Sequence, residues 1–311
     1  MAQEPDKALL NKHFLRYWLA TRPGFLAASL IPVLIGAAAV AHGGGKVSFL
    51  LLLLTLLATA LVHAGINVLN DYYDDENGTD RCNTQRIFPF TGGSRFIQNG
   101  VLSSGETFVF GALLLSTAML LGVGLAWASG TGLLWIGVAG LLLGWGYSAP
   151  PLRLNSRGLG EPAVALGFGI LTPLGAWFVQ TGEMAFYPVL VSLPVALLVM
   201  NILFINQFPD HQADAASGKH HWVVRLGLEK SPSIYLASVA LAAAILLLLA
   251  LTGAVPFWSL LSVLPLGLAF KAGVILRENA QQPAALEPAI KMTIASMVLH
   301  GMLLTLTLWL V

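Results

Sequence analysis

Runs of apolar residues about 20 long recur along the whole chain, and a run of that length crosses the hydrocarbon core of a bilayer as one helix. The polar stretches between the runs are too short to form a separate soluble domain. A soluble domain is about a quarter charged, whereas 10% of these residues are charged and 56% are hydrophobic. The sequence therefore predicts an all-α, polytopic membrane protein with one membrane-embedded domain over residues 1–311.

Nine of the apolar runs are candidate transmembrane helices. They cover residues 24–42, 48–70, 107–127, 131–147, 162–180, 185–207, 232–252, 256–276 and 289–311. The segment that precedes the first run is mixed and amphipathic, without the short apolar core and small-residue cleavage site of a secretory signal. We expect this segment to be retained and the chain to form a nine-helix bundle.

The lysine and arginine residues predict how the bundle is oriented. Of the 16 basic residues, Lys46 alone falls on the opposite side of the nine-span model. Because positively charged short loops stay in the cytoplasm, we expect a cytoplasmic amino terminus and an external carboxyl terminus. The two long polar loops, about 71–106 and 208–231, then both lie on the cytoplasmic side. The expected location is a bacterial inner membrane.

Two further features exclude classes of protein. The net charge is +1, which gives no indication of a nucleic-acid partner. Cys82 is the single cysteine, so the chain has no internal disulfide and no cysteine-based metal site.

The first polar loop begins with the sequence NVLNDYYDDENGTD at residues 67–80. Helical spacing places four polar side chains on one face where the second apolar run ends: Asn67, Asn70, Asp71 and Asp74. Gly78 permits a turn that would bring Asp80 back towards this face. The sequence thus predicts a cluster of carboxylate and amide groups at a cytoplasmic helix end.

A second cluster follows the sixth apolar run, with the sequence NQFPDHQAD at residues 206–214. The same spacing places Asn206, Asp210 and Asp214 on one face. An asparagine followed four residues later by an aspartate therefore occurs twice, each time at the cytoplasmic end of an apolar helix. The repetition indicates a functional duplication. We expect His220 and His221, just beyond this cluster, to be ordinary loop residues.

The chemistry of both clusters favours Mg²⁺. Carboxylate and amide oxygens, without thiols or a histidine cluster, are hard ligands that suit Mg²⁺ shared with substrate phosphates. We therefore predict a diphosphate held by two facing clusters, with Mn²⁺ able to substitute. The expected metal ligands are Asn70, Asp71, Asp74, Asp80, Asn206, Asp210 and Asp214. Basic residues on the same membrane face would neutralise the diphosphate: Lys219, Arg225, Arg153 and Arg157.

Two other interpretations stand beside this one. Acidic residues just outside a membrane helix are often only solvated loop residues, although two matched clusters are harder to explain in that way. An ion-coupled transporter also uses intramembrane acidic residues. A transporter places its ionisable groups near the bilayer midplane between broken helices, whereas these clusters lie at cytoplasmic helix ends.

The same residues resemble a known family, the UbiA superfamily of intramembrane prenyltransferases, and within it the menaquinone-type branch. The stretch NDYYDDENGTD with TGGSRFIQNG at 91–100 is similar to the first signature of that family. YSAPPLRLNSRGLGE at 147–161 is similar to the loop between helices four and five, and DHQADAASGKHHWVVRLG at 210–227 to the second aspartate motif. Four ordered motifs over most of the chain make the resemblance specific.

The resemblance implies a nine-helix bundle whose central cavity is capped by the two cytoplasmic loops and binds a polyprenyl diphosphate with Mg²⁺. It also implies an aromatic acceptor, 1,4-dihydroxy-2-naphthoate, whose carboxylate is replaced to give demethylmenaquinone. The implied catalytic residues are Asn70, Asp74, Asp210, Lys219 and Arg153. The expected substrate-binding residues are Asn67, Tyr147, Arg157, Arg95, Ser94 and Arg225.

One position departs from the family pattern. Phe208 and Pro209 precede Asp210 where the resemblance implies a basic residue. Because proline kinks or ends a helix, we expect a disturbed geometry of Asp210 relative to Asn206. A lost basic contact here also leaves other acceptors open: 4-hydroxybenzoate, homogentisate, a porphyrin-type alcohol or a glycerol phosphate. The YSAPPLR and GGSR strings favour the naphthoate.

Overall fold

The computed structural model describes residues 3–310, which form helices joined by turns and loops and contain no β-strand. The α-helices are α1 (His13–Ala20), α2 (Ala27–His42), α3 (Phe49–Glu76), α4 (Thr79–Cys82), α5 (Ser104–Ser129), α6 (Gly132–Ser148), α7 (Gly160–Leu166), α8 (Thr172–Thr181), α9 (Tyr187–Ala216), α10 (Trp222–Leu251), α11 (Leu266–Asn279) and α12 (Glu287–Trp309). Short 3-10 segments are η1 (Lys7–Asn11), η2 (Pro23–Phe25), η3 (Leu154–Ser156), η5 (Phe257–Val263) and η6 (Pro283–Leu286), and η4 (Gly167–Leu171) is a π-helical turn between α7 and α8. The all-α prediction is confirmed.

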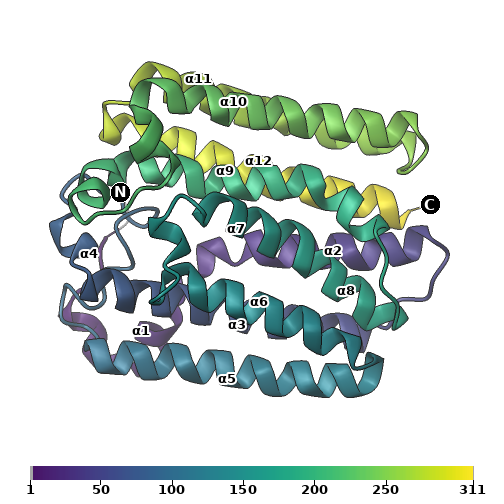
Figure 1. Cartoon of the computed structure of the whole chain (residues 1–311), viewed down its shortest axis with the longest axis horizontal. Coiled ribbons are helices and arrows are strands. Elements are labelled where there is room, and N and C mark those ends of the chain that lie inside the picture. The colour runs from purple at the N-terminus through teal and green to yellow at the C-terminus, as the bar shows by residue number, and fades with distance from the viewer. Residues whose placement is uncertain (1–2, 311) are drawn as a thin grey trace.

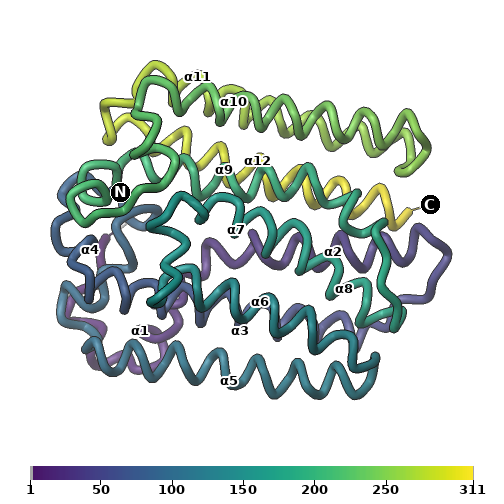
Figure 2. The backbone as a smooth tube through the Cα atoms, in the orientation of Figure 1, coloured from purple at the N-terminus to yellow at the C-terminus, as the bar shows by residue number. Residues whose placement is uncertain are grey.

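The long helices run side by side along the longest axis of the molecule (Figure 1, Figure 2). Helix α5 lies at one edge against α3, and α10 and α11 lie at the opposite edge. Between them, α2 packs against α8 and α12, and α9 packs against α10. The largest group of buried apolar side chains comes from α2, α9, α10, α11 and α12. This packing fixes α3 and α9, which carry the two aspartate motifs, within one bundle.

Eight helical segments of the described chain are long and apolar enough to cross a membrane. They are Pro23–His42, Phe49–Glu76, Ser104–Ser129, Gly160–Thr181, Tyr187–Ala216, Trp222–Leu251, Phe257–Asn279 and Pro283–Trp309. Helix α6, at the place of the fourth predicted span, is apolar but shorter, at 17 residues. The chain is therefore an integral membrane protein by length and composition, and the ninth span depends on α6.

The predicted loop over 208–231 is wrong. Helix α9 continues to Ala216 and α10 begins at Trp222, so the connection between them is five residues long, and a kink at Gly227 (φ 80°) separates the first turn of α10 from its long span. Pro209 lies inside α9 without ending it. A proline removes one backbone hydrogen bond and kinks a helix, but proline is tolerated in membrane helices where neighbouring elements pack around it, and Pro209 is buried. The predicted disturbance at Asp210 is therefore not a helix end.

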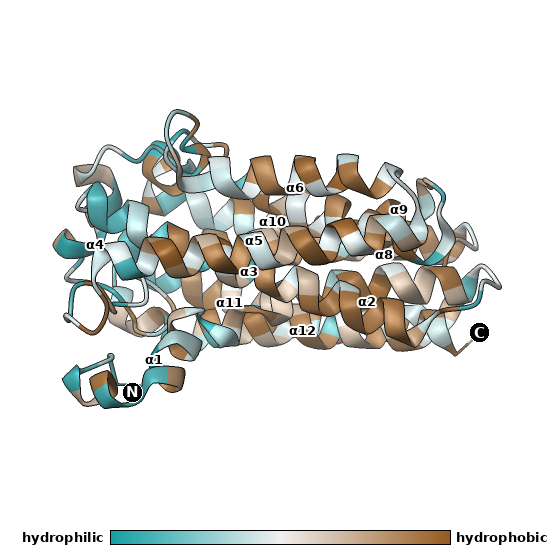
Figure 3. Ribbon diagram, turned by 90° about the horizontal axis from the view of Figure 1, so that it is seen from below, coloured by the Kyte–Doolittle hydropathy of each residue, from teal (hydrophilic) through white to brown (hydrophobic). Residues whose placement is uncertain are grey.

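The first polar loop is also shorter than predicted, because α3 stays helical to Glu76. Gly78 then adopts a left-handed backbone conformation (φ 81°), which turns the chain into α4. The loop ends at Ser103, where Ser103 and Glu106 form a capping box that starts α5. Hydrophilic residues gather at this end of the bundle, around α4 (Figure 3). The carboxyl end of α12 lies at the opposite end.

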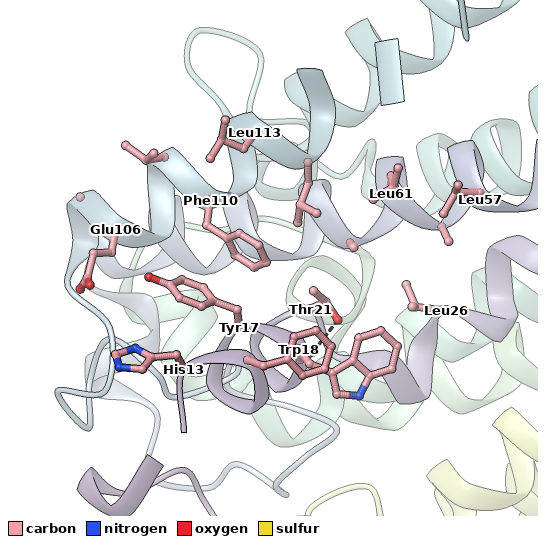
Figure 4. Close-up of a pocket in the computed structure, with 16 residues that line it drawn as sticks. His13, Tyr17, Trp18, Thr21, Leu26, Leu57, Leu61, Glu106, Phe110 and Leu113 are labelled. Carbon is pink, nitrogen blue, oxygen red and sulfur yellow. Dashed lines mark hydrogen bonds between the residues drawn. The ribbon is translucent and has the colours of Figure 1, made fainter. Parts of the chain in front are cut away.

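A groove of about 840 Å³ lies between α1, α3 and α5 (Figure 4). Tyr17 of α1 and Phe110 of α5 meet there with ring centroids 4.8 Å apart. The lining is apolar apart from a few polar side chains, among them Thr21 and Glu106. This groove is on the flank of the bundle, and the central cavity expected from the sequence remains a prediction.

Candidate active site

Lys219 joins the two aspartate motifs. Its Nζ lies 3.0 Å from Asp74 Oδ1 on α3 and 3.3 Å from Asp214 Oδ1 on α9. All three side chains are buried, at 9%, 11% and 8% exposure. Burial opposes the charged form of Lys219, but the two carboxylates outweigh it and raise the pKa of the lysine above its usual value. Motifs that are far apart in the sequence therefore meet at one cation.

Asp74 is held in place by amide groups on its own helix end. Asn70 Nδ2 donates to Asp74 Oδ2 at 3.2 Å, and Asn77 Nδ2 donates to Asp74 Oδ1 at 3.2 Å. Asn70 also donates to Ser148 Oγ at 2.8 Å, at the end of α6. The structure thus pairs Asn70 with Asp74, as helical spacing predicts. Ser148 was not singled out, although it lies within the YSAPPLR string.

Asp214 has a second partner in His221. His221 Nε2 lies 3.0 Å from Asp214 Oδ2, and its Nδ1 accepts from Val224 N at 3.4 Å. Since Nδ1 is an acceptor, Nε2 carries the proton and donates it to the carboxylate. His221 lies in the connection before α10, as predicted, but it is 2% exposed and its side chain caps that helix. His220 is exposed.

Asp71 faces the amino-terminal segment rather than Lys219. It forms a buried ion pair with Arg22 and accepts from Ser94 N at 3.2 Å. Asn67 Nδ2 donates to Thr21 O at 3.0 Å, next to the same arginine. Arg22 was missed as a site residue, because its place before the first apolar run is typical of a basic residue that only sets orientation. Asn67 and Asp71 therefore bind the amino-terminal segment. Asn70 and Asp74, on the same face of α3, instead contact Ser148 and Lys219.

Asp80 returns to the cluster after the turn at Gly78. Its side chain is 3% exposed, and Oδ2 is buried with no hydrogen-bond partner within the described chain. Arg95 donates to the backbone oxygen of Asp80. Burial, and then the negative charges of Asp74 and Asp71, raise the pKa of Asp80 well above its usual value. Asp80 therefore has an oxygen that a cation would stabilise.

Asp210 ties the second motif to the first polar loop. Asn83 Nδ2 donates to Asp210 Oδ1 at 2.5 Å, and Gly92 N donates to Asp210 Oδ2 at 3.2 Å. Asn206, one turn earlier on α9, has a buried Oδ1 without a partner among residues 3–310. A further hydrogen bond of 2.8 Å joins Thr79 Oγ1 to Ser217 Oγ. These three hydrogen bonds join the two motif regions in addition to the contact of Lys219 with Asp74.

The remaining predicted site residues lie around this centre. Ser94 and Arg95 are buried, and Tyr147 is half-buried near the end of α6. Arg153 and Arg157 are exposed. In the part of the chain that the structure describes, no ion pair links an aspartate to the other basic residues of the prediction: Arg153, Arg157 and Arg225. Lys219 is the member of the predicted basic set that reaches the carboxylates.

The backbone at Gly93 approaches Asp80 closely enough to predict the effect of a substitution. Gly93 has φ 75°, and a Cβ added there would collide with the Asp80 carboxylate. We expect Gly93→Ala to displace Asp80 and to lower both turnover and thermal stability. Gly253→Ala is the matched control, since Gly253 has φ 73° and open space around it, so it bears only the backbone cost of about 1–2 kcal/mol. Equal effects of the two variants on turnover would contradict the contact with Asp80.

The donor set fits Mg²⁺. Five carboxylates gather with three cations, Arg22, Arg95 and Lys219: Asp71, Asp74, Asp80, Asp210 and Asp214. The excess is negative, and the donors are hard oxygens, two of them buried without a partner. Among residues 3–310, no group of three or more histidine, cysteine, aspartate or glutamate side chains is arranged to hold a metal ion without other ligands. Mg²⁺ does not need such a group, since it keeps several waters and binds one or two carboxylates together with substrate phosphates.

The chain is similar in sequence to two bacterial proteins of known name. The chain is 29% identical over 292 residues to a 1,4-dihydroxy-2-naphthoate octaprenyltransferase of Bacillus subtilis, covering 94% of this chain and 91% of that protein. It is also 29% identical over 304 residues to the Escherichia coli protein of the same name, covering 94% and 95%. These relatives span nearly the full length of the chain.

Solved structures share the fold. The apo structure of a UbiA homologue from Aeropyrum pernix matches with a TM-score of 0.67 at 15% identity, covering 90% of this chain and 97% of that one. A UbiA homologue from Archaeoglobus fulgidus bound to GPP and Mg²⁺ matches with a TM-score of 0.60 at 16% identity, covering 93% and 99%. The model of the UbiA prenyltransferase family matches residues 29–297, and nothing in these comparisons supports a transporter. The chain is therefore a prenyltransferase enzyme of the UbiA family.

Proposed function

We propose that this enzyme transfers a polyprenyl group from a polyprenyl diphosphate to 1,4-dihydroxy-2-naphthoate in a Mg²⁺-dependent reaction. The observation that carries the proposal is the contact of Asp74 and Asp214 with one buried lysine, since it joins both motifs in a single acidic centre to which Mg²⁺ would bind a diphosphate. The acceptor is proposed from the names of the bacterial relatives. Acceptors such as 4-hydroxybenzoate and homogentisate are the alternatives within the same class of reaction.

The residue roles follow from position and chemistry. Six side chains would hold Mg²⁺ on the diphosphate: Asn70, Asp74, Asp80, Asn206, Asp210 and Asp214. When bound, the metal neutralises the charge that builds on the leaving diphosphate. Lys219 adds direct charge compensation from between the motifs. Asp71 is paired with Arg22, so it would orient that arginine towards the same centre.

The proposed reaction needs no protein nucleophile. The bond between the allylic carbon and the diphosphate oxygen breaks, and its electron pair leaves with the diphosphate. The electron-rich ring carbon that bears the carboxylate then attacks the allylic cation. Loss of that carboxylate as carbon dioxide returns the bonding pair to the ring. The protein contributes positioning and a preorganised field, and its apolar surroundings keep water from the cation.

The acceptor is tested by competition. Purified enzyme in detergent would be supplied with Mg²⁺, one polyprenyl diphosphate and an equimolar mixture of naphthoate, 4-hydroxybenzoate and homogentisate. We expect prenylated naphthoate to be the main product by mass spectrometry. A product formed mainly from either of the other acceptors would replace the naphthoate in the proposal.

Removal of divalent cations is expected to abolish activity. Because the proposed ligands are oxygen donors, EDTA should stop turnover, Mg²⁺ or Mn²⁺ should restore it, and a zinc-selective chelator should have little effect. The measurement is product formation after dialysis and metal addition. Full turnover in EDTA would show that the carboxylates serve another purpose.

We also propose that the end of the bundle with the aspartate motifs faces the cytoplasm. Fifteen of the 16 basic residues lie on that side of the nine-span model, and hydrophilic residues gather around α4 (Figure 3). A tag at the carboxyl terminus should then be labelled from outside intact cells by an impermeant reagent. A matched tag at the amino terminus should be labelled only after permeabilisation. The reverse pattern would overturn the orientation.

A further inference from the structure

We infer that Glu161 is a positioning residue for the diphosphate site, acting through the amino end of α10. The inference rests on the proposed function, because it concerns how the same site is held in shape. Glu161 is the second residue of α7, and its side chain is fully buried, at 0% exposure. A buried carboxylate is costly unless hydrogen bonds satisfy it. Oε2 of Glu161 is buried with no partner among residues 3–310, so the partners of Oε1 show what this carboxylate stabilises.

The Glu161 carboxylate contacts two other helices of the site region. Its Oε1 accepts from the backbone N of Trp222 at 2.8 Å and from Gln207 Nε2 at 3.1 Å. Trp222 is the first residue of α10, and Gln207 follows Asn206 on α9. The first backbone N–H groups of a helix have no partner within it, so an oxygen acceptor there stabilises the start of the helix. Glu161 thus fixes the start of α10 against α9.

The start of α10 is where the site residues of this region are held. His221 is the cap of α10 and binds Asp214 at 3.0 Å. Lys219, two residues earlier, binds Asp74 and Asp214 and has its own backbone N bonded to Asp214 O at 2.9 Å. The connection between α9 and α10 is five residues long, so a shift of the helix start moves both side chains.

Three more hydrogen bonds tie the segment 155–161 to the segment 219–225. His220 N donates to Ser156 O at 2.8 Å, Trp222 Nε1 donates to Gly158 O at 2.9 Å, and Arg225 Nη2 donates to Arg157 O at 2.6 Å. At Gly158 (φ 72°), an added Cβ would lie 2.8 Å from Arg225 Cζ. The two segments are therefore packed directly against each other.

Through these contacts the segment 155–161 supports the start of α10, whereas the exposed arginines of this region do not contact the aspartates of residues 3–310. Within the described chain, neither Arg153 nor Arg157 forms an ion pair with an aspartate. Glu161 binds the backbone N of Trp222, and the preceding residue, His221, binds Asp214. Loss of the Glu161 carboxylate would free the start of α10 and loosen Lys219 and His221. Binding of the diphosphate with its metal should weaken, while the apolar part of the site keeps its shape.

The test compares Glu161→Ala with Glu161→Gln. Binding of geranyl diphosphate in the presence of Mg²⁺, without acceptor, would be measured by calorimetry on the purified full chain in detergent. We expect Glu161→Ala to raise the Kd by about 10- to 100-fold, the usual effect of losing an outer partner of a ligand-binding group. Glu161→Gln keeps an oxygen acceptor in the same place and should stay near wild type. Trp222→Phe, which removes the bond to Gly158, should shift Kd in the same direction by less.

Turnover gives a second readout. Glu161→Ala should raise the KM for the prenyl diphosphate and leave the KM for the acceptor unchanged. His300→Ala is the matched control for a buried hydrogen bond lost elsewhere: His300 is 0% exposed on α12, and its Nδ1 lies 2.7 Å from Ser262 O. It should lower thermal stability without changing either Kd or KM.

The outcomes separate this inference from the proposed function. If Glu161→Ala folds and binds geranyl diphosphate with wild-type Kd, or if it changes the KM for the acceptor alone, the positioning role is wrong. If Glu161→Ala does not fold, Trp222→Phe carries the test, and an unchanged Kd in that variant overturns the role. If the wild-type protein itself binds no prenyl diphosphate with Mg²⁺, the proposed function fails first.

Discussion

Replacing Asp74 or Asp214 by asparagine is expected to lower turnover at least about a thousandfold, and replacing both should do scarcely more. The reason is the shared contact with Lys219, which makes the two carboxylates parts of one centre. Residues that act as a unit are strongly non-additive in their effects on rate. Once one aspartate is lost, little stabilisation of the leaving diphosphate remains for the other to provide.

The experiment measures kcat and thermal stability for the two single variants and the double variant. Asparagine keeps the shape of aspartate, so expression should change little. Glu183→Gln is the control for a carboxylate changed to an amide, because Glu183 is exposed in the connection between α8 and α9. Effects that multiply in the double variant would mean two separate sites. The same series at Asp210 tests whether Pro209 has altered the second motif.

Lys219→Met is expected to destabilise the enzyme in EDTA by about 3–5 kcal/mol, the usual cost of removing one partner from a buried ion pair. Asp74 and Asp214 would then face each other without a cation. Mg²⁺ should recover more stability in this variant than in the wild type, because the metal would replace the missing positive charge. The measurement is the thermal midpoint of each protein in EDTA and in Mg²⁺.

An exposed lysine provides the comparison. Lys291 lies 2.7 Å from Glu287 on α12 and is 59% exposed, so its ion pair is solvated and worth about 0–1 kcal/mol. Lys291→Met should leave the midpoint and its Mg²⁺ dependence unchanged. A Lys219→Met protein as stable as the wild type in EDTA would contradict the central place of Lys219 between the motifs.

The parts of the fold that depend on local pattern could be predicted from the sequence. Apolar runs placed the long helices, because a membrane span needs a fixed length of apolar chain, but the polar ends of α3, α9 and α10 extend six to ten residues beyond the predicted spans. The spacing of Asn70 and Asp74 predicted their pairing, since residues four apart share a helix face. The turn at Gly78 was also predictable, because glycine adopts a left-handed conformation without steric cost.

The parts that depend on contacts between distant segments could not be predicted. Nothing local indicates that Arg22 pairs with Asp71 or that His221 binds Asp214. Nor does any local pattern indicate that Glu161 accepts a hydrogen bond from the first backbone N–H of α10. The length of α9 was missed for a different reason. A local rule ends a helix at proline, but packing around Pro209 overrides that rule within the bundle.

The fate of the acceptor carboxyl group tests the proposed reaction most directly. Purified enzyme would be incubated with Mg²⁺, a polyprenyl diphosphate and naphthoate labelled in the carboxyl carbon. We predict that each prenylated product forms with release of one labelled carbon dioxide and one diphosphate, and that the product carries no label. A prenylated product that keeps the labelled carboxyl group, or an absence of any prenylated naphthoate while another acceptor is consumed, would contradict the proposed reaction.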